Sequence, residues 1–456
     1  MKQYETYKDS GIQWLGKIPS HWETIAMKFY FYMKGRIGWQ GLKAEEFIEE
    51  GPYLVTGTDF ENGRVVWERC YHISDERYNE APEIHVKKGD LLITKDGTVG
   101  KLAYIDSLPE KVSLNSHLLI LRPYADNVSN HFMYWALQAS NFEYYTGLAQ
   151  NGSIMASLSQ EKIGDYKLGL PSLTEQQAIA SYLDYKVGQI DAAIKEKEAS
   201  LEDLKAYRNA IISEAVTKGL DKNVPMKDSG VEWIGEIPAN WIIQRVKFLL
   251  EASKDCLKVG PFGSALSGND FKNEGYWVYN QRTVLDNNFD SNDTFVNEEK
   301  YQELIGFSVK EGDFLITTRG TIGKVAIVPA NHKKGVLHPC LIRFRVNEAL
   351  VDKEFLKYVF NDTNIVAQQV KFNSNSTTID VIYSYTLKEL NIVLPPIKEQ
   401  RKIVEALKEN IAKLDESISH VTAQIADLKS YKSSVISEAV TGKVDLREWT
   451  PKTATA

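Results

Sequence analysis

Two long stretches of the chain carry apolar side chains at steps of three and four residues, with charged side chains between them. The first stretch runs from about Glu175 to Val216 and the second from about Glu399 to Val440. This spacing is the a/d pattern of a coiled coil, and neither stretch contains proline. Each stretch therefore predicts one helix roughly 60 Å long, at about 1.5 Å per residue.

The two predicted helices share one register. Leu183 corresponds to Leu407 and Ile190 to Leu414, a constant offset of 224 residues without an insertion. A long helix with a narrow apolar seam needs a partner, so two such helices in one chain are expected to pair with each other. The expected seam residues are Leu183, Ile190, Ile194, Leu201, Leu204, Leu407, Leu414, Ile418, Ile425 and Leu428.

The repeat extends beyond the helices. Residues 8–22 read KDSGIQWLGKIPSHW and residues 227–241 read KDSGVEWIGEIPANW, an offset of 219. A glycine-spaced segment ending at Lys17 resembles part of a phosphate-binding loop, but no Ser or Thr follows it and the second copy has Glu236 there. We therefore expect a structural motif whose apolar side chains pack together: Trp14, Leu15, Ile18 and Trp22.

Between each such motif and its helix lies a body of strand and turn signals. Residues 89–105 (GDLLITKDGTVGKLAYI) and 312–328 (GDFLITTRGTIGKVAIV) each predict two strands joined by a turn. Helical spacing follows at residues 131–145 and 354–370. The pattern predicts an α+β protein of two similar mixed bodies and two long helices. The expected segments are a first body (1–170), a first helix (171–221), a second body (222–394), a second helix (395–447) and a C-terminal tail (448–456).

Composition limits the cellular setting and the partners. The three cysteines lie far apart without a CxxC pair, which favours a reducing cytoplasm over a disulfide framework. The N-terminus lacks an apolar signal segment, and no apolar run reaches 18 residues, so we expect a cytoplasmic protein without a membrane span. The net charge of −7 argues mildly against nucleic-acid binding. It does not exclude it, because only the binding face needs to be positive.

Signatures of catalysis are missing from the sequence. There is no HExxH, no Cys/His cluster at ligand spacing, no GxGxxG after a strand, no Asn-Pro-Pro-Tyr and no complete Walker A. We therefore expect no catalytic residue, no metal site and no cofactor bound by this chain. Asp90 and Asp313 each follow glycine at a strand entrance, where a turn-capping role is expected.

The ordered and duplicated motifs carry a family resemblance that covers essentially the whole chain. They are DSGIQWLGKIPSHW, GDLLITKDGTVGK, LPSLTEQ and SEAVTKG in the first half, and DSGVEWIGEIPANW, GPFGSAL, GDFLITTRGTIGK, LPPIKEQ and SEAVTGK in the second. In this order they resemble the specificity subunit of type I restriction–modification systems. The resemblance implies two pseudo-symmetric target recognition domains joined by two long antiparallel coiled-coil helices.

Polar and aromatic side chains in the loops of the two bodies are the expected DNA-binding positions. Arg and Gln make bidentate contacts to guanine and adenine edges, and Lys, Ser and Thr suit phosphates. The expected DNA-binding residues are Arg36, Trp39, Gln40, Lys95, Thr98, Lys101, Asn151, Ser153, Lys258, Ser264, Gln281, Arg282, Arg319, Thr321, Lys324, Ser376 and Thr377.

The resemblance also implies partners. It implies double-stranded DNA, two modification subunits that dock on the long helices, and restriction subunits. S-adenosylmethionine, ATP and Mg²⁺ are then expected on those partners. An alternative from another class is a coiled-coil scaffold that binds proteins and never recognises DNA. Contiguous apolar patches on the bodies would favour the scaffold, and polar loops converging on one side would favour DNA recognition.

Overall fold

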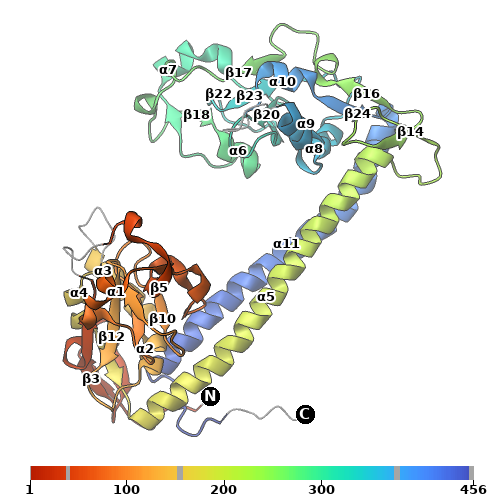
Figure 1. The fold of residues 1–456 in the computed structure, drawn as a ribbon. Helices are drawn as coiled ribbons and strands as arrows, with labels where there is room; N and C mark the ends of the chain where they lie inside the picture. The colour runs from red at the N-terminus through yellow and green to blue at the C-terminus, as the bar shows by residue number, and fades with distance from the viewer. Residues whose placement is uncertain (1, 37–41, 151–157, 374–380, 451–456) are drawn as a thin grey trace. The chain divides into compact units, whose positions relative to one another are not determined.

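The computed structural model describes residues 2–36, 42–150, 158–373 and 381–450. The chain forms two compact units: unit 1 contains residues 1–198 and 423–456, and unit 2 contains residues 199–422. Both predicted long helices are present, as α5 (Leu173–Lys218) and α11 (Ile397–Val440) (Figure 1). Each unit therefore contains one body together with parts of both long helices. Within the described ranges, no helix is long and apolar enough to cross a membrane.

The predicted seam of the two helices is buried within the single chain. Its most deeply buried members are Leu183, Ile190, Ile194, Leu407 and Ile425. The remaining predicted seam residues are half-buried: Leu201, Leu204, Leu414, Ile418 and Leu428. Because the seam residues pack against each other within the chain, the other faces of the two helices are the ones accessible to solvent or to other proteins.

Ion pairs beside the seam give the direction of the helices in unit 1. Asp191 Oδ1 lies 2.7 Å from Lys432 Nζ, and Glu198 Oε1 lies 2.9 Å from Lys429 Nζ. The residue number rises along α5 while it falls along α11, so the helices are antiparallel. In unit 2 the same two helices are joined by Arg208 and Asp415, whose Nε and Oδ1 atoms are 2.6 Å apart.

Unit 1 contains several small sheets, in which most neighbouring strands are antiparallel and one pair is parallel. Its hairpin β9–β10 is the predicted strand pair of residues 89–105, which confirms that prediction. The four-stranded antiparallel sheet has the order β10 (Leu102–Tyr104), β9 (Leu91–Thr94), β12 (Leu118–Pro123) and β4 (Phe31–Lys34). The three-stranded sheet has the order β11 (Val112–Leu114), β5 (Ile48–Val55) and β8 (Tyr71–His72), with β11 parallel to β5. The short pairs are β1 (Tyr7–Asp9) with β2 (Lys17–Pro19), β3 (Glu23–Ala26) with β13 (Lys167–Leu170), and β6 (Phe60–Glu61) with β7 (Arg64–Val65).

Unit 2 repeats this topology. Its four-stranded sheet has the order β17 (Leu257–Val259), β23 (Leu341–Phe344), β20 (Phe314–Thr317) and β21 (Val325–Ile327). Its three-stranded sheet has the order β19 (Phe295–Val296), β18 (Tyr276–Tyr279) and β22 (Gly335–Leu337). The short pairs are β14 (Met226–Asp228) with β15 (Glu236–Pro238), and β16 (Ile242–Arg245) with β24 (Asn391–Leu394). The pseudo-symmetry inferred from the repeat is therefore confirmed for the two main sheets and for two of the short pairs, whereas β6–β7 has no counterpart among the described strands of unit 2.

Both predicted helical patches are interrupted. In unit 1 the patch forms α2 (Asn130–Ala136) and α3 (Ser140–Gln150), and in unit 2 it forms α8 (Lys353–Asn361) and α9 (Ile365–Asn373). The break in unit 2 falls at Asp362-Thr363-Asn364, where the Thr363 hydroxyl accepts a hydrogen bond from Ile365 N at 3.3 Å. Such side chains compete with helical hydrogen bonds and favour helix starts, which accounts for the break. The shorter helices are α1 (Asp75–Asn79), α4 (Gln160–Asp165), α6 (Gln281–Leu285), α7 (Glu298–Glu303) and α10 (Ser384–Glu389).

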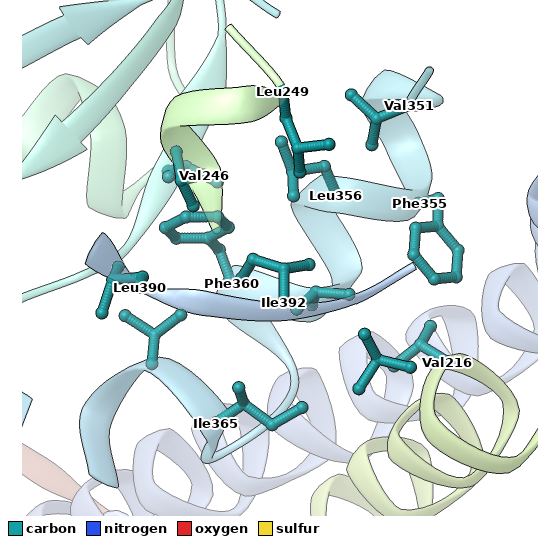
Figure 2. Close-up of a cluster of buried hydrophobic side chains, with 14 of the residues drawn as sticks. Val216, Val246, Leu249, Val351, Phe355, Leu356, Phe360, Ile365, Leu390 and Ile392 are labelled. Carbon is teal, nitrogen blue, oxygen red and sulfur yellow. The ribbon is translucent and has the colours of Figure 1, made fainter. Parts of the chain in front are cut away.

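The ends of the long helices belong to the cores of the bodies. Figure 2 shows Val216, near the end of α5, in one buried cluster of unit 2 with Phe355 of α8 and Ile392 of β24. In unit 1 the predicted structural motif packs as expected, with Ile18 and Trp22 fully buried. Removing this apolar surface from water anchors each helix end in its body.

Candidate nucleic-acid interface

Sheet topology brings four loops of unit 1 to one edge. Strand β12 begins at Leu118, which pairs with Thr94 at the end of β9, and a few residues on Ile120 pairs with Lys34 at the end of β4. Strand β11 ends at Leu114, shortly before β12 begins, and β5 runs parallel to β11, so both strands end beside this edge. The segments that follow β4, β5, β9 and β11 therefore lie together. We call residues 35–36, 56–58, 95–100 and 115–117 the first loop cluster.

The same arrangement recurs in unit 2. Leu341 at the start of β23 pairs with Thr317 at the end of β20, and Val259 at the end of β17 pairs with Ile342. The parallel strands β18 and β22 also end there. We call residues 260–264, 280–282, 318–323 and 338–340 the second loop cluster.

Matching backbone hydrogen bonds hold the two loop clusters. Lys95 N donates to His117 O at 2.9 Å, and Thr318 N donates to Cys340 O at 3.2 Å. Next along, Leu158 N donates to Lys95 O at 2.8 Å, as Ile382 N does to Thr318 O at 3.0 Å. The hydrogen-bonded frame around Lys95 and Thr318 is thus the same in both units. The segment after the central strand of the three-stranded sheet differs, because unit 1 has a 3-10 turn and the β6–β7 pair there and unit 2 has α6.

At equivalent positions the two clusters present different chemistry. The first carries Asp96 and His117, whose Oδ2 and Nδ1 atoms lie 3.4 Å apart. In the second these positions are taken by Arg319, which is exposed, and by Cys340, which is half-buried. Among the described residues, Arg319 has no carboxylate partner. A surface with a carboxylate and one with a guanidinium cannot complement the same base edges.

Some of the predicted DNA-binding residues of the first unit have accessible side chains, and others already bind groups inside the unit. Thr98 is exposed and Lys95 is half-buried in the turn between β9 and β10. Lys101 Nζ donates to Gly57 O at 3.2 Å, so its ammonium holds the 56–58 loop. Arg36 is only 3% exposed. Its Nε donates to Leu114 O at 2.8 Å and its Nη2 to Ser113 Oγ at 2.9 Å, so it holds the end of β11, next to the 115–117 loop.

The predicted residues of the second unit also divide. Ser264, Arg319 and Thr321 are exposed and Gln281 is half-buried. The Lys324 ammonium donates to Asn361 O, and Lys258 lies 4.8 Å from the centre of the Phe307 ring. The predicted residues Trp39, Gln40, Asn151, Ser153, Ser376 and Thr377 lie outside the described residues.

Arg282 faces an acidic surrounding. Its Nη1 lies 3.3 Å from Asp293 Oδ2 and its Nε lies 3.9 Å from Asp286 Oδ2. These groups and the neighbouring Asn280 line a polar cavity of about 250 Å³. Because two carboxylates lie beside it, the charge of Arg282 is largely balanced, whereas the exposed Arg319 has no such neighbour among the described ion pairs.

Sequence reasoning missed the segments that precede β12 and β23. His117 and Asn115 belong to the first cluster, and His338 and Cys340 belong to the second. A signal was present, because NSHLLI and HPCLIR align at the same offset of 223 residues as the two predicted strand pairs. His338 Nδ1 lies 2.8 Å from Cys340 Sγ and accepts from Cys340 N at 3.2 Å.

The His338–Cys340 pair is electrically neutral. Burial lowers the pKa of His338 and raises the pKa of the Cys340 thiol, so neither group is charged near neutral pH. An uncharged thiol is a poor nucleophile, so the pair suits hydrogen bonding and packing. No group of three or more His, Cys, Asp or Glu side chains that could hold a metal ion occurs among the described residues.

Asp90 and Asp313 support the frame behind the clusters. Asp90 Oδ2 accepts from Lys87 N at 2.7 Å, and Asp313 Oδ2 accepts from Lys310 N at 2.7 Å, which confirms the predicted turn-capping role. The sequence did not reveal that Asp90 also receives two guanidinium bonds from Arg122, both at 2.7 Å. Asp313 pairs in the same way with two arginines of β23 and its continuation, Arg343 and Arg345.

Two similar bodies with one frame and different exposed loops define a two-domain recognition protein. The family model of the type I restriction modification DNA specificity domain matches residues 39–203 and 255–426. The chain therefore belongs to the family of type I restriction–modification specificity subunits. In this family, the two recognition domains provide the DNA sequence specificity of the subunit.

Relatives and a solved structure agree with this assignment. The chain is 23% identical over 441 residues to the putative type I restriction enzyme MjaX specificity subunit of Methanocaldococcus jannaschii, covering 95% of this chain and 96% of that one. It is 21% identical to the type I restriction enzyme EcoKI specificity subunit of Escherichia coli K12, covering 94% and 90%. The fold is similar to that of a chain in a structure on complex assembly and conformational transition of the type I R-M system. That match has a TM-score of 0.65 at 14% identity and covers 94% of this chain and 99% of the other.

Proposed function

We propose that the chain directs a type I methyltransferase and restriction complex to a split DNA site whose two halves differ. The first loop cluster recognises one half and the second loop cluster recognises the other. The observation that carries this proposal is the pairing of matching backbone hydrogen bonds with unlike side chains, as in Asp96 and His117 against Arg319 and Cys340. One frame used twice with different surfaces fits two different half-sites.

The side chains assigned to DNA follow from their exposure. Lys95 and Thr98 in the first unit, and Gln281, Arg319 and Thr321 in the second, are placed to meet bases or phosphates. Arg36, Lys101 and Lys324 act as positioning residues, because their cationic groups already bind carbonyl oxygens inside the unit. Ser264 extends the second loop cluster with a hydroxyl group suited to a phosphate.

The rest of the complex supplies what this chain lacks. The net charge of −7 is unfavourable for DNA binding, so partner subunits contribute part of the positive surface. Two modification subunits dock on faces of α5 and α11 outside the buried seam, and restriction subunits join them. S-adenosylmethionine, ATP and Mg²⁺ bind to those partners, and the complex works in the cytoplasm without catalytic groups from this chain.

The first test is methylation mapping of genomic DNA at single-molecule resolution. The chain is expressed with its modification partner, and modified adenines are located. We expect a split, asymmetric motif with a modified adenine in each half. A partner that is active with another specificity subunit but adds no methylation with this one would contradict DNA recognition and favour the protein-binding scaffold.

A further inference from the structure

Phe262 stands at the tip of a loop in the second loop cluster, and its side chain is 87% exposed. The sequence of this loop is Gly260-Pro261-Phe262-Gly263-Ser264. An apolar ring held almost entirely in water gives the folded chain little stability. Because the ring belongs to the same loop cluster as the predicted base-recognising side chains, it is a candidate for contact with DNA.

Both ends of this loop are fixed. Gly260 N donates to Leu341 O at 2.9 Å, and a Cβ at Gly260 would come within 2.2 Å of His338 O, so only glycine fits there. On the other side, Ala265 N donates to Phe262 O at 2.8 Å and the side chain of Leu266 is buried. The loop thus presents Phe262 from an ordered base at the edge where β17 and β23 meet.

Gly263 differs from Gly260 because nothing in the folded chain requires it. Its φ angle is not positive, and a Cβ added there would meet no atom within 4 Å. A side chain at this position would therefore be tolerated by the protein alone. It would obstruct a large surface that approaches the loop tip, and DNA bound at the second loop cluster is such a surface.

We propose that Phe262 is an apolar wedge that enters between two adjacent base pairs at the border of the second half-site. The proposal rests on the proposed function, and it adds deformation of the DNA to direct base contacts. Phenylalanine is among the side chains that unstack a base step in this way. Gly263 permits close approach, and the exposed Ser264 hydroxyl is placed to bind the adjoining phosphate. Because flexible steps unstack more easily, the wedge would add specificity at a position that no polar side chain contacts.

The test uses the full chain assembled with its modification subunits and duplexes of its mapped site. 2-Aminopurine is placed at successive purine positions through the second half-site and its borders. With the unmodified chain we expect the fluorescence to rise at one position. Phe262→Ala should abolish that rise and weaken binding about tenfold. Phe262→Leu, which keeps an apolar side chain, should retain part of both.

A matched control is Phe248→Ala. Phe248 is 58% exposed in the same unit, but the neighbouring Leu250 pairs with Val346, beyond the end of β23 that faces away from the loop cluster. This variant should bind and unstack DNA as the unmodified chain does. Unchanged recognition of the first half-site by Phe262→Ala would show that the variant is folded and assembled.

Other outcomes overturn the wedge. The wedge is wrong if the unmodified chain binds the duplex without any rise in 2-aminopurine fluorescence. It is also wrong if the fluorescence rise persists with Phe262→Ala. A third outcome is that the unmodified chain causes no fluorescence rise although Phe262→Ala still weakens binding. If replacing one thymine by deoxyuridine then removes the difference in affinity between the two proteins, Phe262 packs on a thymine methyl group instead. Absence of any sequence-specific binding by the unmodified complex would contradict the proposed function itself.

Discussion

Gln176 and Gln400 make the same three hydrogen bonds in the first turns of the two long helices. Gln176 Oε1 accepts from Ser129 N at 2.8 Å, and its Nε2 donates to the carbonyl oxygens of Asn127 and Pro171, both at 2.9 Å. Gln400 Oε1 accepts from Asp352 N at 2.8 Å, and its Nε2 donates to the carbonyl oxygens of Leu350 at 3.0 Å and Pro395 at 2.8 Å. Ser129 and Asp352 are the N-cap residues of α2 and α8. One buried amide thus locks each long helix to its body.

Replacing either glutamine by alanine should destabilise its own unit. Gln176→Ala leaves one buried amide donor and two carbonyl acceptors without partners, at a cost of about 3 kcal/mol. Hydrogen-exchange mass spectrometry can follow the two units separately, and only unit 1 should lose protection. The matched control is Gln177→Ala, because Gln177 is exposed. Equal behaviour of the two variants would show that the buried amide contributes nothing.

The Asp90–Arg122 pair should be worth far more than an exposed pair. The Asp90 side chain is 1% exposed, and Asp90→Asn leaves the guanidinium of Arg122 without its counter-charge, at about 3 kcal/mol. Asp106→Asn removes the exposed partner of Arg64 and should cost under about 1 kcal/mol. Urea unfolding of the two variants provides the comparison. Similar losses in both would mean that burial adds nothing to the pair.

Arg319→Ala and Lys95→Ala should each impair one half-site. Loss of a base or phosphate contact by Arg319 should weaken binding about tenfold to a hundredfold, with relaxed specificity in the second half only. Binding to duplexes with single changes in each half measures this. Arg245→Ala is the control, because Arg245 is an exposed arginine of unit 2 on β16, outside the second loop cluster, where it pairs with Glu389. A variant that loses recognition of both halves equally would contradict independent domains.

Lengthening both long helices should change the accepted spacing of the half-sites. Four residues inserted after Glu198 and four after Thr422 add about 6 Å to each helix and preserve their pairing. We expect methylation of sites whose spacer is longer by roughly one or two base pairs, at about 3.4 Å each. The same insertion between the exposed Ala125 and Asp126 should leave the spacing unchanged. An unaltered spacer in the helix variant would show that the helices do not set it.

The sequence was sufficient for features that repeat or that depend on local periodicity. The helices begin at Leu173 and Ile397, close to the predicted starts, because their apolar pattern continues over many turns. The strand pairs around Lys95 and Arg319 were likewise predictable from short apolar runs on either side of a glycine turn. These features need only neighbouring residues, so a single chain reveals them.

The composition of the loop clusters was less accessible, because it depends on strand register between distant segments. His117 comes beside Lys95 only because Leu118 pairs with Thr94. Arg36 stands in a glycine-rich stretch of sequence, which suggests an exposed contact, yet its guanidinium binds a carbonyl 78 residues away, at Leu114. No local pattern marks that carbonyl as a partner. A direct DNA contact by Arg36 stays a prediction, and its burial argues against it.

The division of the chain between its units has a consequence for synthesis. Unit 2 is one continuous segment, whereas unit 1 is completed by residues made after it. Asp445 N donates to Lys2 O at 2.9 Å, and the Arg447 guanidinium lies 5.2 Å from the centre of the Tyr4 ring. Domains generally fold as they emerge from the ribosome. Unit 2 can therefore fold first, whereas unit 1 can fold completely only after the C-terminal part of α11 has been synthesised. A chain truncated before residue 423 would therefore contain a folded second domain and an incompletely folded first domain.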